Sequence, residues 1–158
     1  MAPRRKRKRR PAGNRADGAR KDVMTVKQRS ACMSRIRGKD TRPELFVLGV
    51  LSGIGLEPES HARDLPGRPD FVFRDLRIAI FVDGDFWHGW RFPRWRHKLA
   101  SFWEMKIEAN RARDGRNHAR LRRAGWRVIR IWEHQIERQP EQVRQRVAGI
   151  LSVAVVQS

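Results

Sequence analysis

The sequence predicts an α/β fold, a mixed β-sheet flanked by helices (α+β in the order of its elements). Three short segments rich in aliphatic and β-branched residues have the length of strands, and they alternate with longer segments of helical spacing. The chain has 158 residues, which is the size of one domain, and 39% of them are apolar, enough for one modest core. Its longest apolar runs, such as Ile78 to Val82, are too short to cross a membrane.

Two helices are expected before the first strand. The first begins at Val23, where apolar residues take helical spacing among Arg and Lys. The second has a defined start, because Thr41 and Glu44 fit a capping box in which Thr41 is the N-cap and Glu44 is the third helical residue. Gly53 ends it. The apolar residues with helical spacing in these two segments are Val26, Met33, Ile36, Leu45, Leu48 and Leu51.

Three strands are expected, over residues 70–73, 77–82 and 126–132. A polar and aromatic loop over residues 83–99 follows the second strand. Ser101 and Glu104 fit another capping box and open a long helix that runs to Arg123. A last helix begins near Pro140, and its inner face comprises Val143, Val147, Ile150 and Leu151.

The charge of the chain indicates a polyanionic partner. Its 36 Lys and Arg against 17 Asp and Glu give a net charge of +19, which favours nucleic acid over a membrane surface. The single cysteine, Cys32, excludes an intramolecular disulfide and any zinc site with two cysteine ligands. The basic N-terminus lacks the apolar segment of a secretory signal. We therefore expect a cytoplasmic protein, associated with the nucleoid, that binds no membrane.

Residues 1–22 differ from the rest of the chain. They contain ten Lys and Arg against two Asp, and almost no large apolar side chain. Because such a segment cannot offset its ordering entropy by burial, we expect a disordered basic tail, followed by a single domain over residues 23–158. The tail is either an arm that contacts DNA or an extension without a role in binding.

The first candidate for chemistry is Asp70, at the start of a strand directly after Pro69. A carboxylate there has a fixed direction and partial exposure, as a ligand of a divalent metal requires, although an Asp after Pro can also merely cap a turn. The next strand ends at Val82-Asp83, so a hairpin would display acidic groups side by side, as in Mg²⁺-dependent nucleases. The acid-x-Lys pattern typical of the second strand in such nucleases is absent.

The loop after that strand places Phe86 and Trp87 beside His88. Exposed aromatic rings on a basic protein serve as stacking surfaces or wedges for bases, and a neutral histidine can accept a proton from water. The alternative is an aromatic cluster that seals the sheet edge. On the long helix, separations of three and four residues put one stripe together, and this stripe comprises Trp103, Lys106, Asn110 and Asp114. Asp114 either orients His88 or forms an ion pair with a neighbouring arginine.

These residues carry a resemblance that extends from about Arg29 to His134. The matching segments, in order, are Leu65 to Val72 (LPGRPDFV), Gly84 to His88 (GDFWH), Phe102-Trp103 with Lys106-Ile107, Asn110 and Arg113-Asp114, and Gly125 to Val128 with Trp132-Glu133. The chain thereby resembles the very short patch repair (Vsr-type) DNA mismatch endonucleases. The resemblance implies a type II restriction-endonuclease-like nuclease core. It also implies Mg²⁺-dependent nicking of one strand, 5′ of the thymine in a T·G mismatch that arises when 5-methylcytosine deaminates.

The resemblance also assigns roles. Asp70 matches the aspartate that binds one or two Mg²⁺, and Val82 falls where the family uses a backbone carbonyl as the second metal ligand. His88 matches the active-site histidine, and Glu44 and Asp114 match the two supporting acids. The residues expected to contact DNA are Phe86, Trp87, Trp103, Lys106 and Asn110, with the three aromatic rings acting as wedges beside the mismatch.

One feature departs from the family. Members commonly carry a structural zinc held by Cys and His, and the corresponding places here are Asp85, Trp90 and His134. We therefore expect no structural zinc, and Asp85 could pair with His134 instead. The expected partner is double-stranded DNA with a T·G mismatch, bound by a monomer that works alongside mismatch-repair proteins and a repair polymerase. Two alternatives stay open: a nuclease of the same core with another specificity, and a DNA-binding module without catalysis.

Overall fold

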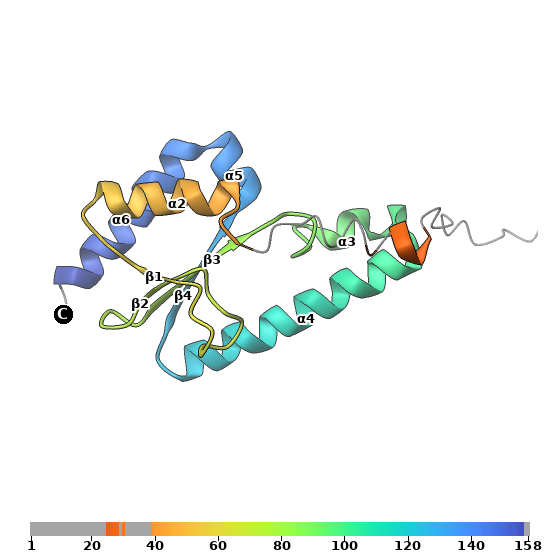
Figure 1. Ribbon diagram of the computed structural model, residues 1–158, viewed down its shortest axis with the longest axis horizontal. Helices are drawn as coiled ribbons and strands as arrows, with labels where there is room; N and C mark the ends of the chain where they lie inside the picture. Colours follow the sequence, from red (N-terminus) through yellow and green to blue (C-terminus); the bar gives the residue numbers. More distant parts are fainter. Residues whose placement is uncertain (1–24, 29, 31–38, 157–158) are drawn as a thin grey trace, which may run out of the picture.

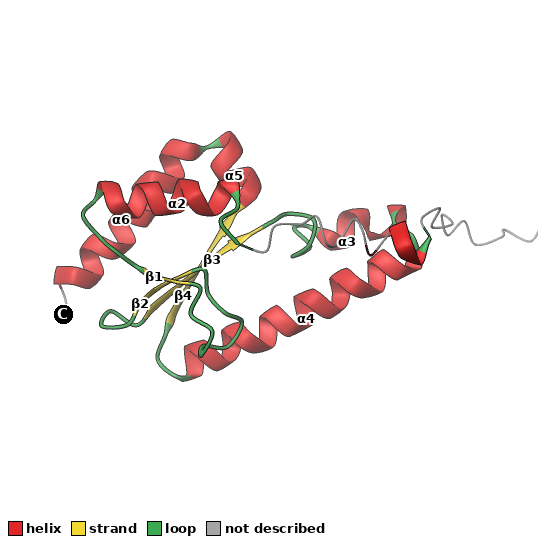
Figure 2. Cartoon of the chain, viewed as in Figure 1, coloured by secondary structure: helices red, strands yellow, loops and turns green. Residues whose placement is uncertain are grey.

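The computed structural model of the protein describes residues 25–28, 30 and 39–156. It confirms the mixed sheet flanked by helices (Figures 1 and 2). Residues 26–28 are helical, but most of the helix expected from Val23 lies outside the described residues, and so does the basic tail over residues 1–22. In the described part of the chain, no helix is long and apolar enough to cross a membrane.

The sheet has four strands in the order β1-β2-β3-β4. Their bounds are β1 Glu59–Ser60, β2 Phe71–Phe73, β3 Ile78–Asp83 and β4 Arg127–Trp132. The pairs β1–β2 and β2–β3 are antiparallel, and β3–β4 is parallel. The three expected strands are thus present, each shifted by one residue at one or both ends, whereas β1 is too short for its residues to show any period.

One face of the sheet packs against α2 (Arg42–Gly53), α5 (Glu133–Arg138) and α6 (Pro140–Val156), as Figure 1 shows. The inner face expected for the last helix is correct, since Val143, Val147 and Leu151 are buried. The core on this face comprises Val47, Val50, Leu51, Phe71, Phe73, Ile78, Ile80, Ile129, Ile131, Val143, Val147 and Leu151. The helix α5 was not expected, because its six residues show no apolar period.

The long helix α4 (Ser101–Arg123) covers the other face with its C-terminal half, where Leu121 packs on Ala79 and Phe81. Its N-terminal half extends past the sheet (Figure 1). There α3 (Phe92–Trp95) and the 3-10 helix η1 (Arg96–Lys98) interrupt the loop expected over residues 83–99.

The capping box expected at Ser101 is wrong, because Ala100 is the N-cap and makes no side-chain bond. The backbone N–H groups of Trp103 and Glu104 donate to the Ala100 carbonyl, and the Glu104 side chain pairs with Arg96 instead. The Thr41 cap is confirmed, since its hydroxyl accepts from the Glu44 N–H.

The register of the sheet brings the chemically active segments to one edge. Because β3 and β4 are parallel and Asp83 pairs with Trp132, both strands end at the same edge. Asp70 stands just before β2, and its backbone N–H donates to the carbonyl of Ile80 on β3. The hairpin of β2 and β3 therefore carries Asp70 to the edge where β3 ends.

Candidate active site

Asp70 is fixed against the end of β3. Its Oδ2 accepts a hydrogen bond from the backbone N–H of Val82 at 2.7 Å. In the part of the chain that the structure describes, its Oδ1 accepts no hydrogen bond. The hairpin expected from the sequence thus places Asp70 and Val82 together, as the proposed ligand pair requires. One carboxylate oxygen orients the side chain, and the other remains available to a ligand.

The electrostatic environment of Asp70 favours a cation. Burial raises the pKa of its carboxyl to about 7, and this rise prevails over the opposing hydrogen bond from Val82. The charges of Glu44 and Asp83 raise the pKa further, and His61 lowers it. A divalent metal would offset the repulsion among these acids, and hard oxygen ligands suit Mg²⁺. The residues present therefore fit a Mg²⁺ ion held by Asp70.

Glu44 lies at the start of α2 with only 7% of its surface exposed. Its Oε1 accepts from the Thr41 hydroxyl at 2.7 Å, and its Oε2 accepts from the backbone N–H of Asp40 at 2.8 Å. Glu44 thus has two roles. It caps the start of α2, which fixes its side chain, and its negative charge acts on the carboxyl of Asp70.

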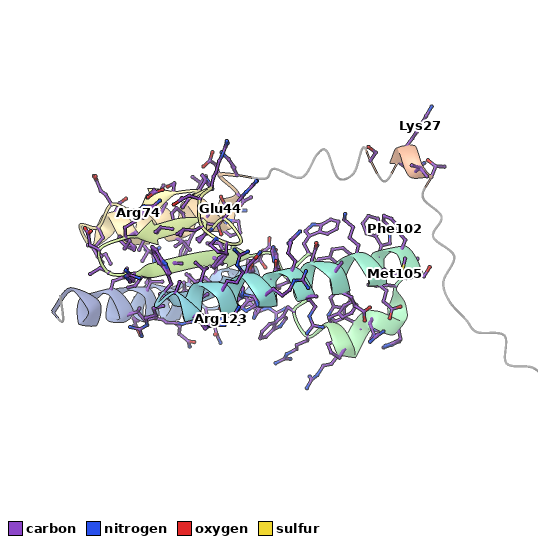
Figure 3. All side chains as sticks on the ribbon, turned by 90° about the horizontal axis from the view of Figure 1, so that it is seen from below. Lys27, Glu44, Arg74, Phe102, Met105 and Arg123 are labelled. Atoms are coloured by element: carbon purple, nitrogen blue, oxygen red, sulfur yellow. The ribbon has the colours of Figure 1, made fainter. Side chains whose placement is uncertain are left out.

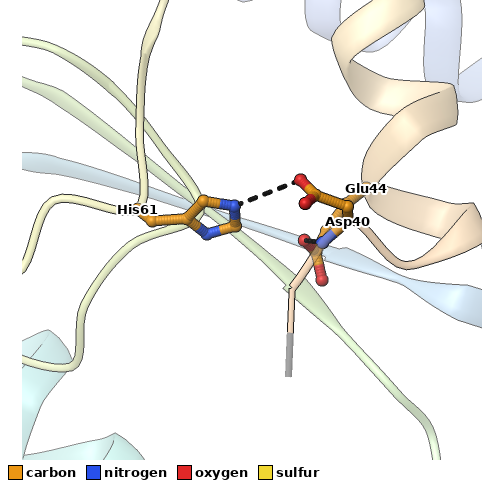
Figure 4. Close-up of side chains that lie close together, drawn as sticks. All are labelled: Asp40, Glu44 and His61. Carbon is orange, nitrogen blue, oxygen red and sulfur yellow. Dashed lines mark hydrogen bonds and ion pairs between the residues drawn. The ribbon is translucent and has the colours of Figure 1, made fainter. Parts of the chain in front are cut away.

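A second group that could hold a metal ion lies around Glu44. Figure 4 shows Asp40, Glu44 and His61 facing one another, with one ligand atom of each within 4.8 Å of the others. The Nε2 of His61 lies 3.5 Å from a carboxylate oxygen of Asp40. Asp40 is largely exposed, and both oxygens of Glu44 already accept hydrogen bonds, so this group fits a metal less well than Asp70 does.

His88 is held by two acids. Its Nδ1 lies 2.8 Å from Oδ2 of Asp114 on α4 and 3.1 Å from Oδ1 of Asp83 at the end of β3. The expected pairing with Asp114 is confirmed, and the alternative is present as well, since Arg113 lies 3.4 Å from the other oxygen of Asp114. Both carboxylates meet Nδ1, so they favour the tautomer with the proton on that nitrogen.

The surroundings of His88 and Asp114 shift the pKa values of both groups. Burial by itself would lower the pKa of His88, but the hydrogen bond that its Nδ1 donates to Asp114 and the charges of Asp83 and Asp114 prevail and raise it. Burial likewise opposes ionisation of Asp114, whose pKa is nevertheless lowered by the hydrogen bond and charge of His88. The carboxylate of Asp114 is thus stabilised as the ionised partner of the imidazole.

A glycine sets the approach of the His88 loop to α4. Gly89 has φ +67°, and a Cβ at this position would lie 2.6 Å from Arg111 and 3.0 Å from Ile107 of the helix. Only a residue without a side chain fits both the conformation and the space. The loop therefore lies directly on α4, which brings His88 within reach of Asp114. We call Glu44, Asp70, Asp83, His88 and Asp114 the polar cluster.

Aromatic rings gather beside the polar cluster, where α4 extends past the sheet. Phe86 stacks on Trp95 with 5.7 Å between ring centroids, and Trp87 meets Trp103 edge to face at 5.7 Å. Phe86, with 41% of its surface exposed, also contacts Trp87 and Trp103. We call Phe86, Trp87, Trp95 and Trp103 the aromatic cluster. Figure 3 shows Phe102 and Met105 at this end of α4 and Arg123 at the other.

The expected stripe on α4 is present. Trp103, Lys106, Asn110 and Asp114 are all partly buried, while Ile107 is fully buried on the neighbouring stripe. The Asn110 amide donates to the backbone carbonyl of Trp87 at 3.2 Å. Asn110 thus links the helix to the aromatic loop, so a contact of its amide with DNA would compete with this bond.

The expected pair of Asp85 and His134 is present. Nδ1 of His134 lies 2.6 Å from Oδ1 of Asp85, and the ring of Trp90 lies 4.5 Å from that of His134. These contacts fasten the start of the aromatic loop to the end of β4. The absence of zinc from the protein stays a prediction.

Sequence reasoning overlooked three residues of the site. Asp83 was noted only as a nearby acid, and nothing in the sequence marked Arg130 or His61 as neighbours of the site. Arg130 donates from Nε to Oδ2 of Asp83 across β3 and β4. Strand alternation could have placed Arg130 on the face opposite Ile129 and Ile131, but identifying its partner required the register of the sheet.

A mixed sheet with buried acids and a histidine at one edge, in a chain of net charge +19, defines a class of protein: nucleases that hydrolyse phosphodiester bonds. A cavity of about 390 Å³ beside His88 and Asp114 agrees with a polyanionic substrate, because Arg68, Arg113 and Asn117 line it.

Comparison with known proteins defines the family. Residues 21–94 match the family described as DNA mismatch endonuclease Vsr. Type II nicking enzyme V.XorIIP of Xanthomonas oryzae pv. oryzae is 42% identical over 117 residues, which cover 73% of this chain and 86% of the relative. Type II nicking enzyme V.NmeDIP of Neisseria meningitidis serogroup C is 36% identical, over 80% of this chain and 90% of the relative. DNA mismatch endonuclease Vsr of Escherichia coli is 39% identical, over 71% and 73%.

The chain therefore belongs to the Vsr family of DNA mismatch endonucleases. It is a DNA endonuclease with a restriction-endonuclease-like fold. The resemblance drawn from the four sequence motifs is confirmed, and so is the expected enzyme class.

Proposed function

We propose that this protein nicks one strand of double-stranded DNA 5′ of the thymine in a T·G mismatch, with Mg²⁺ as its cofactor. The observation that carries the proposal is the convergence of Asp70, Glu44 and the His88–Asp114 pair at the end of β3, in a member of the Vsr family. Binding alone would not require buried acids beside a phosphate. The alternative of a DNA-binding module without catalysis is therefore disfavoured.

Asp70 and the backbone carbonyl of Val82 would hold one or two Mg²⁺ ions. When bound there, Mg²⁺ supplies a Lewis acid that offsets the charge developing on the phosphoryl oxygens. Asp70 keeps its direction through the hydrogen bond from the Val82 N–H. Glu44, fixed by its own helix start, adds the second negative charge that favours a cation at this place.

His88 is the proposed general base. Its Nδ1 is engaged by Asp83 and Asp114, so Nε2 is the nitrogen left to accept the proton of the attacking water. The water oxygen forms the new bond to phosphorus, and the bond from phosphorus to the 3′ oxygen breaks. The products are a 5′-phosphate and a 3′-hydroxyl. Asp114 holds the ring throughout and stabilises the imidazolium that forms.

Mismatch selection is assigned to the aromatic cluster together with Lys106 and Asn110. The partly exposed rings of Phe86, Trp87 and Trp103 can enter between base pairs, where a mispaired step costs less to open than a paired one. Lys106 and Asn110 lie on the same stripe of α4 and would contact the DNA next to the rings.

A second specificity deserves a direct test, because several relatives are named type II nicking enzymes. In that case the same core would nick DNA without requiring a T·G mismatch. We further propose that the enzyme is a cytoplasmic, nucleoid-associated monomer that works alongside mismatch-repair proteins and a repair polymerase.

The experiment is a nicking assay with Mg²⁺ and a panel of strand-labelled duplexes. The panel varies one position as T·G, T·A, C·G, A·C and G·G in several flanking sequences. We expect nicks on the thymine strand only, 5′ of the T in T·G, and a product that carries a 5′-phosphate. Equal nicking of the T·A duplex would favour the second specificity, and binding without nicks in any duplex would support the DNA-binding module.

A further inference from the structure

Arg130 has no part in the roles assigned above, although it forms an ion pair with Asp83. Asp83 is 3% exposed, and Nε of Arg130 donates to its Oδ2. The other oxygen of Asp83, Oδ1, faces Nδ1 of His88 at 3.1 Å. One buried carboxylate therefore contacts a permanent cation with one oxygen and the imidazole with the other.

The register of the sheet explains how these groups meet. Phe81 pairs with Arg130 and Asp83 pairs with Trp132, so Asp83 and Arg130 point to the same face of the sheet. That face is covered by α4, which contributes Asp114 to His88. Proton-donating groups and carboxylates thus alternate across β4, β3, the loop and α4, in the order Arg130, Asp83, His88, Asp114 and Arg113.

A buried carboxylate remains ionised only when it is paired, since burial disfavours its charged form. Arg130 provides that partner for Asp83, and its guanidinium lies over the Trp132 ring at 4.5 Å. Among the described residues, the buried Nη2 of Arg130 has no hydrogen-bond partner. An unsatisfied donor is a cost to stability, so the contact of Nε with Asp83 must offset the unpaired Nη2.

We infer that the Asp83–Arg130 pair positions His88, holding its ring with the proton on Nδ1 so that Nε2 is kept for the substrate. This inference rests on the proposed role of His88 as the base and names two positioning residues for it. Asp83 places a second carboxylate oxygen 3.1 Å from Nδ1, where its negative charge favours a proton on that nitrogen. Arg130 fixes the Asp83 carboxylate through its hydrogen bond, and its charge lowers the pKa of His88, against the effect of the two carboxylates.

Asp83 and Arg130 shift the pKa of His88 in opposite directions. Among the charged and titratable groups facing His88, Asp83 of β3 and Asp114 of α4 raise its pKa, and Arg130 of β4 lowers it. Further groups line the cavities beside His88, namely Arg68, Arg91, and Arg111, Arg113 and His118 of α4. The pKa of His118 is lowered by burial and by Arg130, so it adds no charge near neutral pH. A role limited to folding would not predict opposite responses of His88 to the loss of Asp83 and of Arg130.

The test is an NMR titration of the His88 ring in the full chain without metal or DNA, assigned with the variant His88→Gln. We expect Asp83→Asn to lower the pKa of His88 and Arg130→Gln to raise it. Arg130→Lys keeps the positive charge and should leave the pKa near that of the wild type. The matched controls are Asp75→Asn and Arg127→Gln, which change exposed residues of the turn before β3 and of β4.

If a single variant does not fold, the double variant Asp83→Asn/Arg130→Gln replaces the ion pair by two amides and leaves no unpaired buried charge. Its His88 titration should lie between those expected for the single variants. Shifts no larger than in the controls, or shifts of the same sign in both single variants, would overturn the inference.

A nicking assay completes the test. For each variant, the apparent pKa of the acidic limb in the pH profile of kcat should shift in the same direction as the pKa of His88 measured by NMR. The KM for DNA should stay unchanged. Because the titration needs no substrate, its outcome does not depend on the proposed function. Opposite NMR shifts without any nicking would uphold the positioning role and contradict the proposed function alone.

Discussion

The polar cluster and the aromatic cluster lie side by side and are built in different ways. The polar cluster joins residues from α2, the β2–β3 hairpin, the following loop and α4, and its acids are paired with hydrogen-bond donors or cations. The aromatic cluster joins rings from one loop, α3 and the first turn of α4, and leaves Phe86 partly exposed.

The difference follows from the cost of burial. A buried charge is costly unless it is paired, so the groups of the polar cluster need fixed partners from distant segments. Partly exposed rings carry no such requirement and can exchange their contacts with one another for contacts with bases. The same loop supplies His88 to one cluster and Phe86 and Trp87 to the other. The rings proposed to distort DNA and the histidine proposed to act in hydrolysis would thereby lie within a few residues of each other in the chain.

The largest expected effect is that of Asp70→Ala, which should abolish nicking and leave DNA binding largely intact. Asp70 is the proposed side-chain ligand of the metal, whereas affinity comes from Lys and Arg contacts to phosphates. Single-turnover nicking and a binding titration on the same duplex measure the two properties, with Asp75→Asn as the exposed control. Nicking by the Asp70 variant at a rate near wild type would show that the metal lies elsewhere.

His88→Ala should reduce the nicking rate by a factor on the order of 10²–10⁴, the usual contribution of a general base. A metal held by Asp70 would still polarise the phosphate, so some activity should remain. The measurement is the single-turnover rate at saturating enzyme. A loss of less than about tenfold would remove His88 from the chemical step and make it a phosphate contact.

Within the aromatic cluster, Trp87→Ala should abolish the preference for T·G over T·A duplexes while the protein stays folded. Opening a stacked step costs about a few kcal/mol. Each difference of about 1.4 kcal/mol between mispaired and paired DNA corresponds to a tenfold preference.

The matched control is Trp126→Ala, which removes a ring packed on the core near Leu121. It should lower the melting temperature and leave the T·G to T·A rate ratio unchanged. If Trp87→Ala behaves like this control, the rings of the aromatic cluster serve only to close the core beneath the loop.

The polar cluster should also respond to pH. In the metal-free protein Asp70 has a pKa of about 7, against 3.8 for the ordinary group, so the folded state holds a proton on Asp70 that the unfolded chain has lost. The contribution of Asp70 to the free energy of unfolding is therefore lost as pH rises through about 7.

Because Mg²⁺ must displace this proton, it should raise the melting temperature more at about pH 8 than at about pH 6. Thermal unfolding with and without Mg²⁺ measures the effect, and Asp70→Asn should remove its pH dependence. Equal stabilisation of the wild type at both pH values would contradict the assignment.

Deletion of residues 1–22 should have the smallest effect on selectivity. An arm with ten cations would contact phosphates without reading bases, so its loss should weaken binding similarly for all duplexes. The slope of log affinity against log salt should become flatter, since each phosphate contact adds nearly one unit. An unchanged slope would show that the tail takes no part in DNA binding.

The sequence by itself determined the elements whose signals are local. Short runs of aliphatic and β-branched residues and the Thr41–Glu44 box defined three strands and the start of α2, and four motifs indicated the family. Spacing on α4 correctly grouped Trp103 with Asp114. The capping box predicted at Ser101 was wrong, because the side chain of Glu104 forms an ion pair with Arg96 and does not bond to the helix start.

Only the tertiary structure decided which distant groups meet. The pairing of β3 with β4 brings Arg130 to Asp83, and the approach of Gly89 to α4 brings His88 to Asp114. His61 reaches Glu44 and Asp40 from a loop that carries no pattern. The physical reason is the range of the interactions. Helix capping and apolar periodicity depend on residues within the same turn or strand. The pairing of buried charges depends on the register of the sheet and on the helices that pack across it.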